Sequence, residues 1–228
     1  LLWDIGLNIG HSVRSVQECV AQARDDITVL TNLMEARVLR GPAELMQQVR
    51  ELTAPEFMWP SPEFFRAKME EQRARHTKFA DTEYNLEPNV KGSPGGLRDL
   101  QVIGWIAERH FRVESLEGIP AGEFLSPEEM QILTNGRAFL WQVRYALHMI
   151  TDREEDRLLF DYQRQLADLW GFEDGDKLAV EQFMQVFYRW AQALGQLNEV
   201  VVQYFDQAIL RQNQADDVRR INELSLKH

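Results

Sequence analysis

The residues with the greatest capacity for chemistry lie in segment 85–101, which reads Asn-Leu-Glu-Pro-Asn-Val-Lys-Gly-Ser-Pro-Gly-Gly-Leu-Arg-Asp-Leu-Gln. Its charged side chains are Glu87, Lys91, Arg98 and Asp99, and they alternate with prolines and glycines that restrict or free the backbone. Apolar residues at 97, 100, 103 and 106 then predict the buried face of a helix. Unpaired N–H groups at a helix start favour anions, so these residues could lie beside a phosphate. A glycine-rich loop with a structural ion-pair cluster is the alternative, in which Arg98 orders Glu87 and Asp99 orients Lys91.

A second polar set lies near the N-terminus, where partial alternation of apolar residues predicts a strand over 3–14. His11, Ser12 and Arg14 lie in its last part, and each can donate a hydrogen bond to phosphate oxygens. The alternative is that Arg14 pairs with Asp4 or Glu18 and that His11 packs under a helix.

A third polar set follows in the next predicted helix. Thr28, Asn32 and Glu35 are spaced i, i+4, i+7, which places them on one face, opposite an apolar stripe. Asn32 and Glu35 could line a nucleotide cleft, or the face could simply contact water.

Composition limits the class of protein. With 228 residues, 44% of them hydrophobic, the chain can form one sizeable domain or two small ones. A net charge of −11 argues against binding nucleic acid, which requires a basic surface. The single Cys19 suits a reducing cytoplasm and predicts a small buried hydrophobe. No apolar run is long enough to span a membrane, so we expect no membrane partner.

Apolar spacings of three and four residues predict a mostly α-helical fold, a helical bundle domain with at most one or two strands, confined to about the first 15 residues. Helices are expected from about 16 to 23 and over 27–39, 43–52, 61–79, 97–110, 126–150, a segment ending near 170, and 176–210. Ser126 and Glu129 form a capping-box pattern, and the acids of Asp174-Gly175-Asp176 suit a turn between helices. The charged residues of 61–79 are interpreted mostly as a solvated face. The stripe in 176–210 is interpreted as buried inside a bundle, with a coiled-coil seam between subunits as the alternative.

The aromatic and proline-rich stretch 53–62 and the polar residues from Gln212 onward divide the chain into three regions. Residues 1–54 form the first, residues 55–211 the helical domain, and residues 212–228 a polar tail or linker. Because the sequence begins Leu1-Leu2-Trp3 inside a hydrophobic pattern, we expect it to be part of a longer protein.

Segment 85–101 resembles the helical region of the bacterial PII uridylyltransferase/uridylyl-removing enzyme family, the bifunctional nitrogen sensors. Segments 2–14, 26–37 and 155–163 resemble further parts of that family in the same order. The sister family of glutamine synthetase adenylyltransferases carries a related Lys…Gly-Gly element. The resemblance implies that residues 1–54 are the C-terminal strand and helices of a nucleotidyltransferase α/β domain, which precede the helical bundle domain.

The resemblance also implies an activity, the transfer of UMP from UTP to a tyrosine of the PII signalling protein with magnesium. The Gly-Ser turn and Asp-x-Asp strand that hold magnesium in this superfamily are not in this sequence. We therefore expect no catalytic or metal-ligating residue in this chain and no activity from it alone. The His-Asp hydrolase domain and the glutamine-sensing domains of the family are also expected to be absent. A non-catalytic helical interaction module and an adenylyltransferase-like enzyme are the alternatives.

Overall fold

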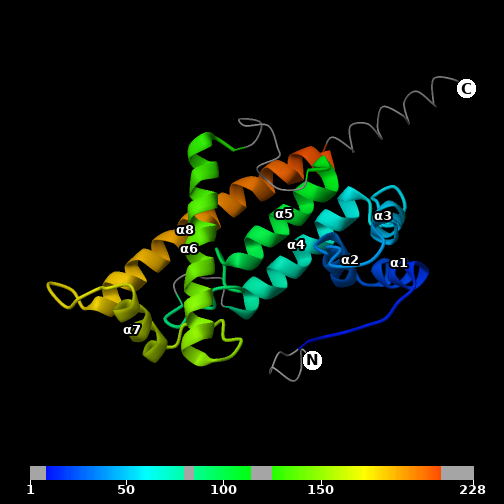
Figure 1. Ribbon diagram of the computed structural model, residues 1–228. Coiled ribbons are helices and arrows are strands. Elements are labelled where there is room, and N and C mark those ends of the chain that lie inside the picture. The colour runs from blue at the N-terminus through cyan, green and yellow to red at the C-terminus, as the bar shows by residue number, and fades with distance from the viewer. Residues whose placement is uncertain (1–8, 80–84, 114–124, 212–228) are drawn as a thin grey trace, which may run out of the picture. The chain divides into compact units, whose positions relative to one another are not determined.

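The computed structural model describes residues 9–79, 85–113 and 125–211, and these are built from helices without a named strand (Figure 1). The mostly α-helical prediction is confirmed. The chain divides into two compact units, residues 1–60 and residues 61–228, each with its own core. Residues 55–60 group with the first unit, whereas the predicted domain limits at 54/55 and 211/212 stay predictions.

The first unit contains α1 (Val16–Asp25), α2 (Ile27–Met34) and α3 (Ala43–Leu52). Ser15 begins α1 with a capping box, because its hydroxyl accepts from the amide of Glu18 and the Glu18 carboxylate returns to the Ser15 amide at 2.7 Å. Asp26 begins α2 by accepting from the amide of Thr28 at 2.7 Å. Ala23, Ile27, Leu30 and Val49 are buried between these helices.

Three expectations for this unit were wrong. Within the predicted strand, residues 9–14 are irregular, since no described neighbouring strand offers them a hydrogen-bond ladder; residues 3–8 lie outside the described residues. Helix α2 ends at Met34 rather than 39, because Val38 and Leu39 are exposed and gain nothing from continuing the helix. Cys19 is half-buried rather than buried.

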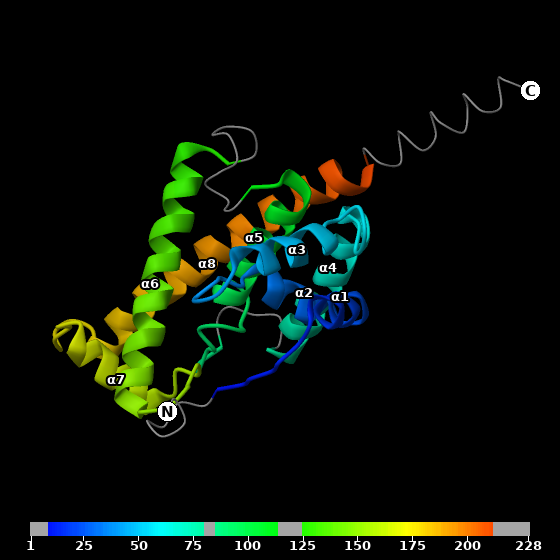
Figure 2. The same ribbon diagram turned by 45° about the vertical axis from the view of Figure 1, so that its right-hand side comes forward.

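The second unit contains α4 (Ser61–Lys78), α5 (Leu97–Phe111), α6 (Pro127–Thr151), α7 (Phe160–Leu169), α8 (Ala179–Phe205) and the π-helix η2 (Asp206–Arg211). Helices α4, α5 and α8 run alongside one another, and α6 crosses α8 steeply in both views (Figures 1 and 2). Ser126 and Glu129 form the predicted capping box of α6. Asp174 accepts from the amide of Ala179 at 2.7 Å and so caps α8, which fits the turn predicted there.

Helix α8 forms the centre of the second unit. Its residues Phe183, Phe187, Leu194 and Val201 are each at most 2% exposed. The stripe is therefore buried inside the bundle as predicted, and no seam between subunits is needed to cover it. Gly136 of α6 allows the close crossing, because a Cβ there would lie 2.9 Å from a methyl carbon of Leu194.

Candidate functional site

The glycine-rich segment is a packed structural element rather than an open loop. All residues from 92 to 97 are buried. Gly95 has a φ of +72°, and a Cβ on it would lie 2.0 Å from the carbonyl oxygen of Ala191 in α8. A Cβ on Gly92 would lie 2.7 Å from the ring of Phe79. Glycine is required at position 95, because φ is positive and the backbone of α8 lies so close. At position 92 a side chain would require the ring of Phe79, the residue after α4, to move.

The amides at the start of α5 are already paired, so the expectation of unpaired amides beside a phosphate was wrong. Leu97 donates to the carbonyl of Val90 at 3.1 Å, and Arg98 donates to the carbonyl of Lys91 at 2.8 Å. The amides of residues 96 and 99 donate to carbonyls of the same loop. A phosphate could bind these N–H groups only by displacing the loop.

Asp99 is the centre of the loop. It is fully buried, and its carboxylate accepts from Arg75 Nη2 at 2.6 Å, contacts His76 Nε2 at 2.9 Å and accepts from the amide of Gly95 at 2.8 Å. Arg75 also donates to the carbonyl of Gly92 at 3.2 Å. The carboxylate therefore fixes the end of α4 to the glycine turn, and its described partners are these three rather than Lys91.

Sequence reasoning missed Arg75 and His76. Arg75 was interpreted as part of the solvated face of a charged helix, and His76 as an isolated histidine without a partner at ligand spacing. The solvated-face interpretation was also wrong for Lys68, which is 2% exposed, pairs with Glu71 at 2.6 Å and lies 4.8 Å from the ring of Trp105. Neighbouring positions on a helix face different directions, so a cation that is exposed and one that is buried can be adjacent in the sequence. No local feature of the sequence distinguishes the two.

The two segments that carry most of the resemblance contact each other. The amide of Val90 donates to the carbonyl of Asp156 at 2.8 Å, and the amide of Leu158 donates to the carbonyl of Pro88 at 2.8 Å. Glu87 pairs with Arg157 at 3.1 Å rather than with Arg98, and it accepts from the amide of Phe160 at the start of α7. Segments 85–91 and 155–160 are thus joined by hydrogen bonds and an ion pair into one substructure of the second unit.

A second carboxylate, that of Asp156, holds this substructure to α6. Asp156 accepts from Arg144 Nε at 2.6 Å and contacts His148 Nε2 at 3.2 Å. Burial by itself would raise the pKa of Asp156, but the hydrogen bonds from Arg144 and His148 and the charges of Arg144 and Lys91 outweigh it, so its pKa lies below the ordinary value. Asp156 therefore stays ionised and holds α6 to the segment that follows it.

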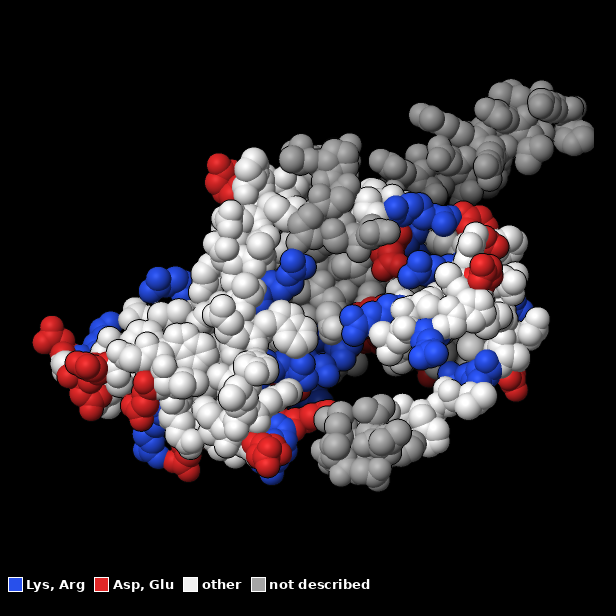
Figure 3. Space-filling model, in the orientation of Figure 1, with Lys and Arg blue, Asp and Glu red and all other residues white. Residues whose placement is uncertain are grey.

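Three cations lie at the surface of the substructure formed by segments 85–99 and 155–158. Lys91 and Arg98 are half-buried, the side chain of Arg157 is 57% exposed, and the guanidinium of Arg98 lies 5.4 Å from the ring of Trp105. Figure 3 shows basic side chains gathered where the end of α4 meets the start of α5. We define the paired segments 85–99 and 155–158, held by Asp99 and Asp156, as the signature platform.

The remaining predicted site residues belong to the first unit. His11, Ser12 and Arg14 are exposed in the irregular segment before α1. Asn32 is exposed on α2, and Glu35 is exposed at the residue that follows this helix. The pKa of Glu18 is lowered by hydrogen bonds from Ser15, with a smaller effect from the charge of Arg14. A contact of these five residues with a nucleotide stays a prediction.

The described residues do not provide a metal site. Over residues 9–79, 85–113 and 125–211, no group of three His, Cys, Asp or Glu side chains could hold a metal ion. The described residues therefore contain no cluster of three or more such side chains that could serve as a magnesium site by themselves. In the same ranges, no helix is long and apolar enough to cross a membrane.

Comparison with known proteins gives a family and several relatives. The family described as GlnD PII-uridylyltransferase matches residues 63–202. Three relatives carry the name "Bifunctional uridylyltransferase/uridylyl-removing enzyme". The protein from Ectopseudomonas mendocina (strain ymp) is 51% identical over 97% of this chain, and that from Pseudomonas aeruginosa (strain UCBPP-PA14) is 53% identical over 97%. The protein from Azotobacter vinelandii (strain DJ / ATCC BAA-1303) is 54% identical over 98%. The chain spans 25% of the length of each. No solved structure matches.

Proposed function

Because the chain belongs to the GlnD PII-uridylyltransferase family, we propose that the whole protein transfers UMP from UTP to a tyrosine hydroxyl of the PII signalling protein. The reaction is an in-line displacement at the α-phosphorus, which releases pyrophosphate. Magnesium would neutralise the triphosphate. Its ligands would come from the superfamily's Gly-Ser turn followed by an Asp-x-Asp strand, a combination that this sequence does not contain. Glutamine sensing and uridylyl removal are likewise assigned to other parts of the protein.

The part played by this chain is to close one side of the nucleotide cleft and to help dock PII. One observation supports this role, which is the anchoring of the signature platform by the buried Asp99. Side chains fixed by packing and buried ion pairs lose little entropy when they meet a substrate. Lys91 and Arg98 are half-buried on this rigid base, and their positive charges suit contacts with phosphate or with acidic groups of PII.

The test is transfer of labelled UMP by the full-length protein that contains this segment. We expect labelling of PII from UTP with magnesium, and at least a tenfold loss in the Arg98→Gln variant, since a charge-assisted hydrogen bond contributes roughly 1.5–3 kcal/mol. Arg189→Gln, an exposed arginine on α8, is the control and should retain full activity.

Two results would contradict the proposal. Labelling from ATP but not UTP would place the protein with the adenylyltransferases. Unlabelled PII with a folded full-length protein would favour an interaction module without catalysis. For the 228-residue chain alone we expect neither transfer nor micromolar binding of Mg-UTP, and calorimetry measures the latter.

A further inference from the structure

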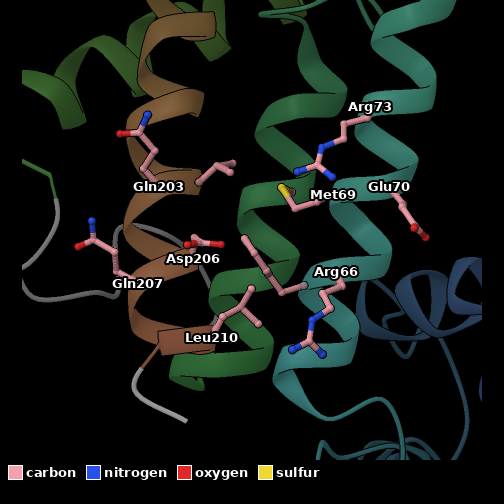
Figure 4. Close-up of a pocket in the computed structure, with 10 residues that line it drawn as sticks. Arg66, Met69, Glu70, Arg73, Gln203, Asp206, Gln207 and Leu210 are labelled. Atoms are coloured by element: carbon pink, nitrogen blue, oxygen red, sulfur yellow. The ribbon is translucent and has the colours of Figure 1, made fainter. Parts of the chain in front are cut away.

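A groove of about 650 Å³ lies between α4 and the end of α8 with η2, away from the signature platform (Figure 4). Phe65 and Met69 are buried and form part of its apolar lining. Polar side chains line it from both sides: Arg66, Glu70 and Arg73 from α4, and Gln203, Asp206 and Gln207 from α8 and η2.

The two arginines face this groove. Arg66 and Arg73 are exposed and seven residues apart, about 10 Å along the axis of α4. Figure 4 shows both guanidinium groups directed toward the groove, whereas the carboxylate of Glu70 points away from it. Neither arginine forms an ion pair with any acid in the described part of the chain.

Two other cations of the same helix are less exposed and have acidic partners. The buried Lys68 pairs with Glu71 at 2.6 Å, and the half-buried Arg75 pairs with Asp99 at 2.6 Å. Arg66 and Arg73 differ from these two cations in both exposure and pairing. Arginine remains charged at every physiological pH, so Arg66 and Arg73 offer a permanent positive charge in a protein whose net charge is −11.

The opposite wall is shaped by η2. A π-helix is wider than an α-helix, and such turns occur frequently at functional sites. Figure 4 shows Asp206, at the start of η2, directed toward α4, with Leu210 beside the groove. A carboxylate at this position can accept a hydrogen bond from a hydroxyl or amine of a ligand.

We propose that this groove binds a small oxyanion, a carboxylate or a phosphate compound, through Arg66 and Arg73. Guanidinium groups bind both kinds of oxyanion with two parallel hydrogen bonds. The apolar part of the ligand would contact Met69 and Leu210. The site needs no residue of the signature platform, so its occupancy does not depend on the proposed transfer activity.

The test is calorimetry of the 228-residue chain with two probes, pyrophosphate and succinate, without magnesium and at constant ionic strength. We expect at least one probe to bind with a Kd of roughly 1 mM or below. Binding of pyrophosphate alone identifies a phosphate site, and binding of succinate alone identifies a carboxylate site. The double variant Arg66→Gln/Arg73→Gln should weaken binding at least tenfold, since two charge-assisted contacts are lost.

The matched control is Lys78→Gln/Arg189→Gln, which removes two exposed positive charges elsewhere in the same unit. It should change the Kd less than twofold. The melting temperature of both double variants should stay close to that of the wild type, because the replaced side chains are exposed. The proposal is overturned if neither probe binds the wild type at roughly 10 mM. It is also overturned if the groove variant binds as well as the wild type.

Discussion

Replacing Asp99 by asparagine should destabilise the second unit strongly, because this carboxylate is fully buried and pairs with Arg75 at 2.6 Å. Asparagine has nearly the shape of aspartate and can still accept a hydrogen bond from the amide of Gly95, but it lacks the negative charge. Arg75, whose side chain is only 17% exposed, then lacks its counter-charge. Removing one partner of a buried pair costs about 3–5 kcal/mol, and the partial exposure of Arg75 favours the lower end.

The free energy of unfolding is measured by urea denaturation, and an unchanged m-value checks that unfolding remains two-state. For a protein of this size, about 3 kcal/mol corresponds to a fall in Tm of roughly 6–12 °C. Asp161→Asn is the control, because Asp161 pairs with Arg164 at an exposed site and should change stability by less than about 0.5 kcal/mol. In a double-mutant cycle with Arg75→Gln, the coupling should exceed about 1 kcal/mol. A loss below about 1 kcal/mol in Asp99→Asn, or no coupling to Arg75, would refute the assignment of this ion pair as the anchor of the platform.

Three further predictions follow from named contacts. Gly95→Ala should lower the free energy of unfolding by at least about 3 kcal/mol, because the new methyl group would overlap the carbonyl of Ala191 and φ is positive. The control Gly104→Ala should instead stabilise α5 by about 0.5–1 kcal/mol. Equal effects of the two substitutions in denaturation would contradict the close approach of α8 to Gly95. Ser126→Ala should lower the free energy of unfolding by about 1 kcal/mol through loss of the α6 cap, and an unchanged value would show that the cap contributes nothing. The pKa of Asp156 is lowered in the folded state, so the stabilisation from this carboxylate is present above its ordinary pKa of 3.8 and is lost as pH falls through the folded pKa. Asp156→Asn should remove that part of the pH dependence of the melting temperature, measured from pH 5 downward. An unaltered pH profile would refute the pairing of Asp156.

The sequence by itself determined the helices and where most of them begin. Apolar spacing and local capping act over four residues or fewer, so α4, α5 and α6 and the cap at Ser126 were predicted from neighbours along the chain. Burial of the α8 stripe followed from its width. The prediction failed at residues 9–14, because a strand requires a partner that apolar alternation cannot supply.

Only the tertiary structure decided what the charged residues of segment 85–101 do. Asp99 and Lys91 lie eight positions apart, yet Asp99 pairs with Arg75 and His76, more than twenty positions away on another helix. Glu87 likewise pairs with Arg157 from a distant segment. The choice of an ion-pair partner depends on which helix faces are buried together, and that burial is a property of the packed bundle. The same reason separates the half-buried, paired Arg75 from the exposed Arg66 and Arg73, although all three lie on one helix that is charged along its length.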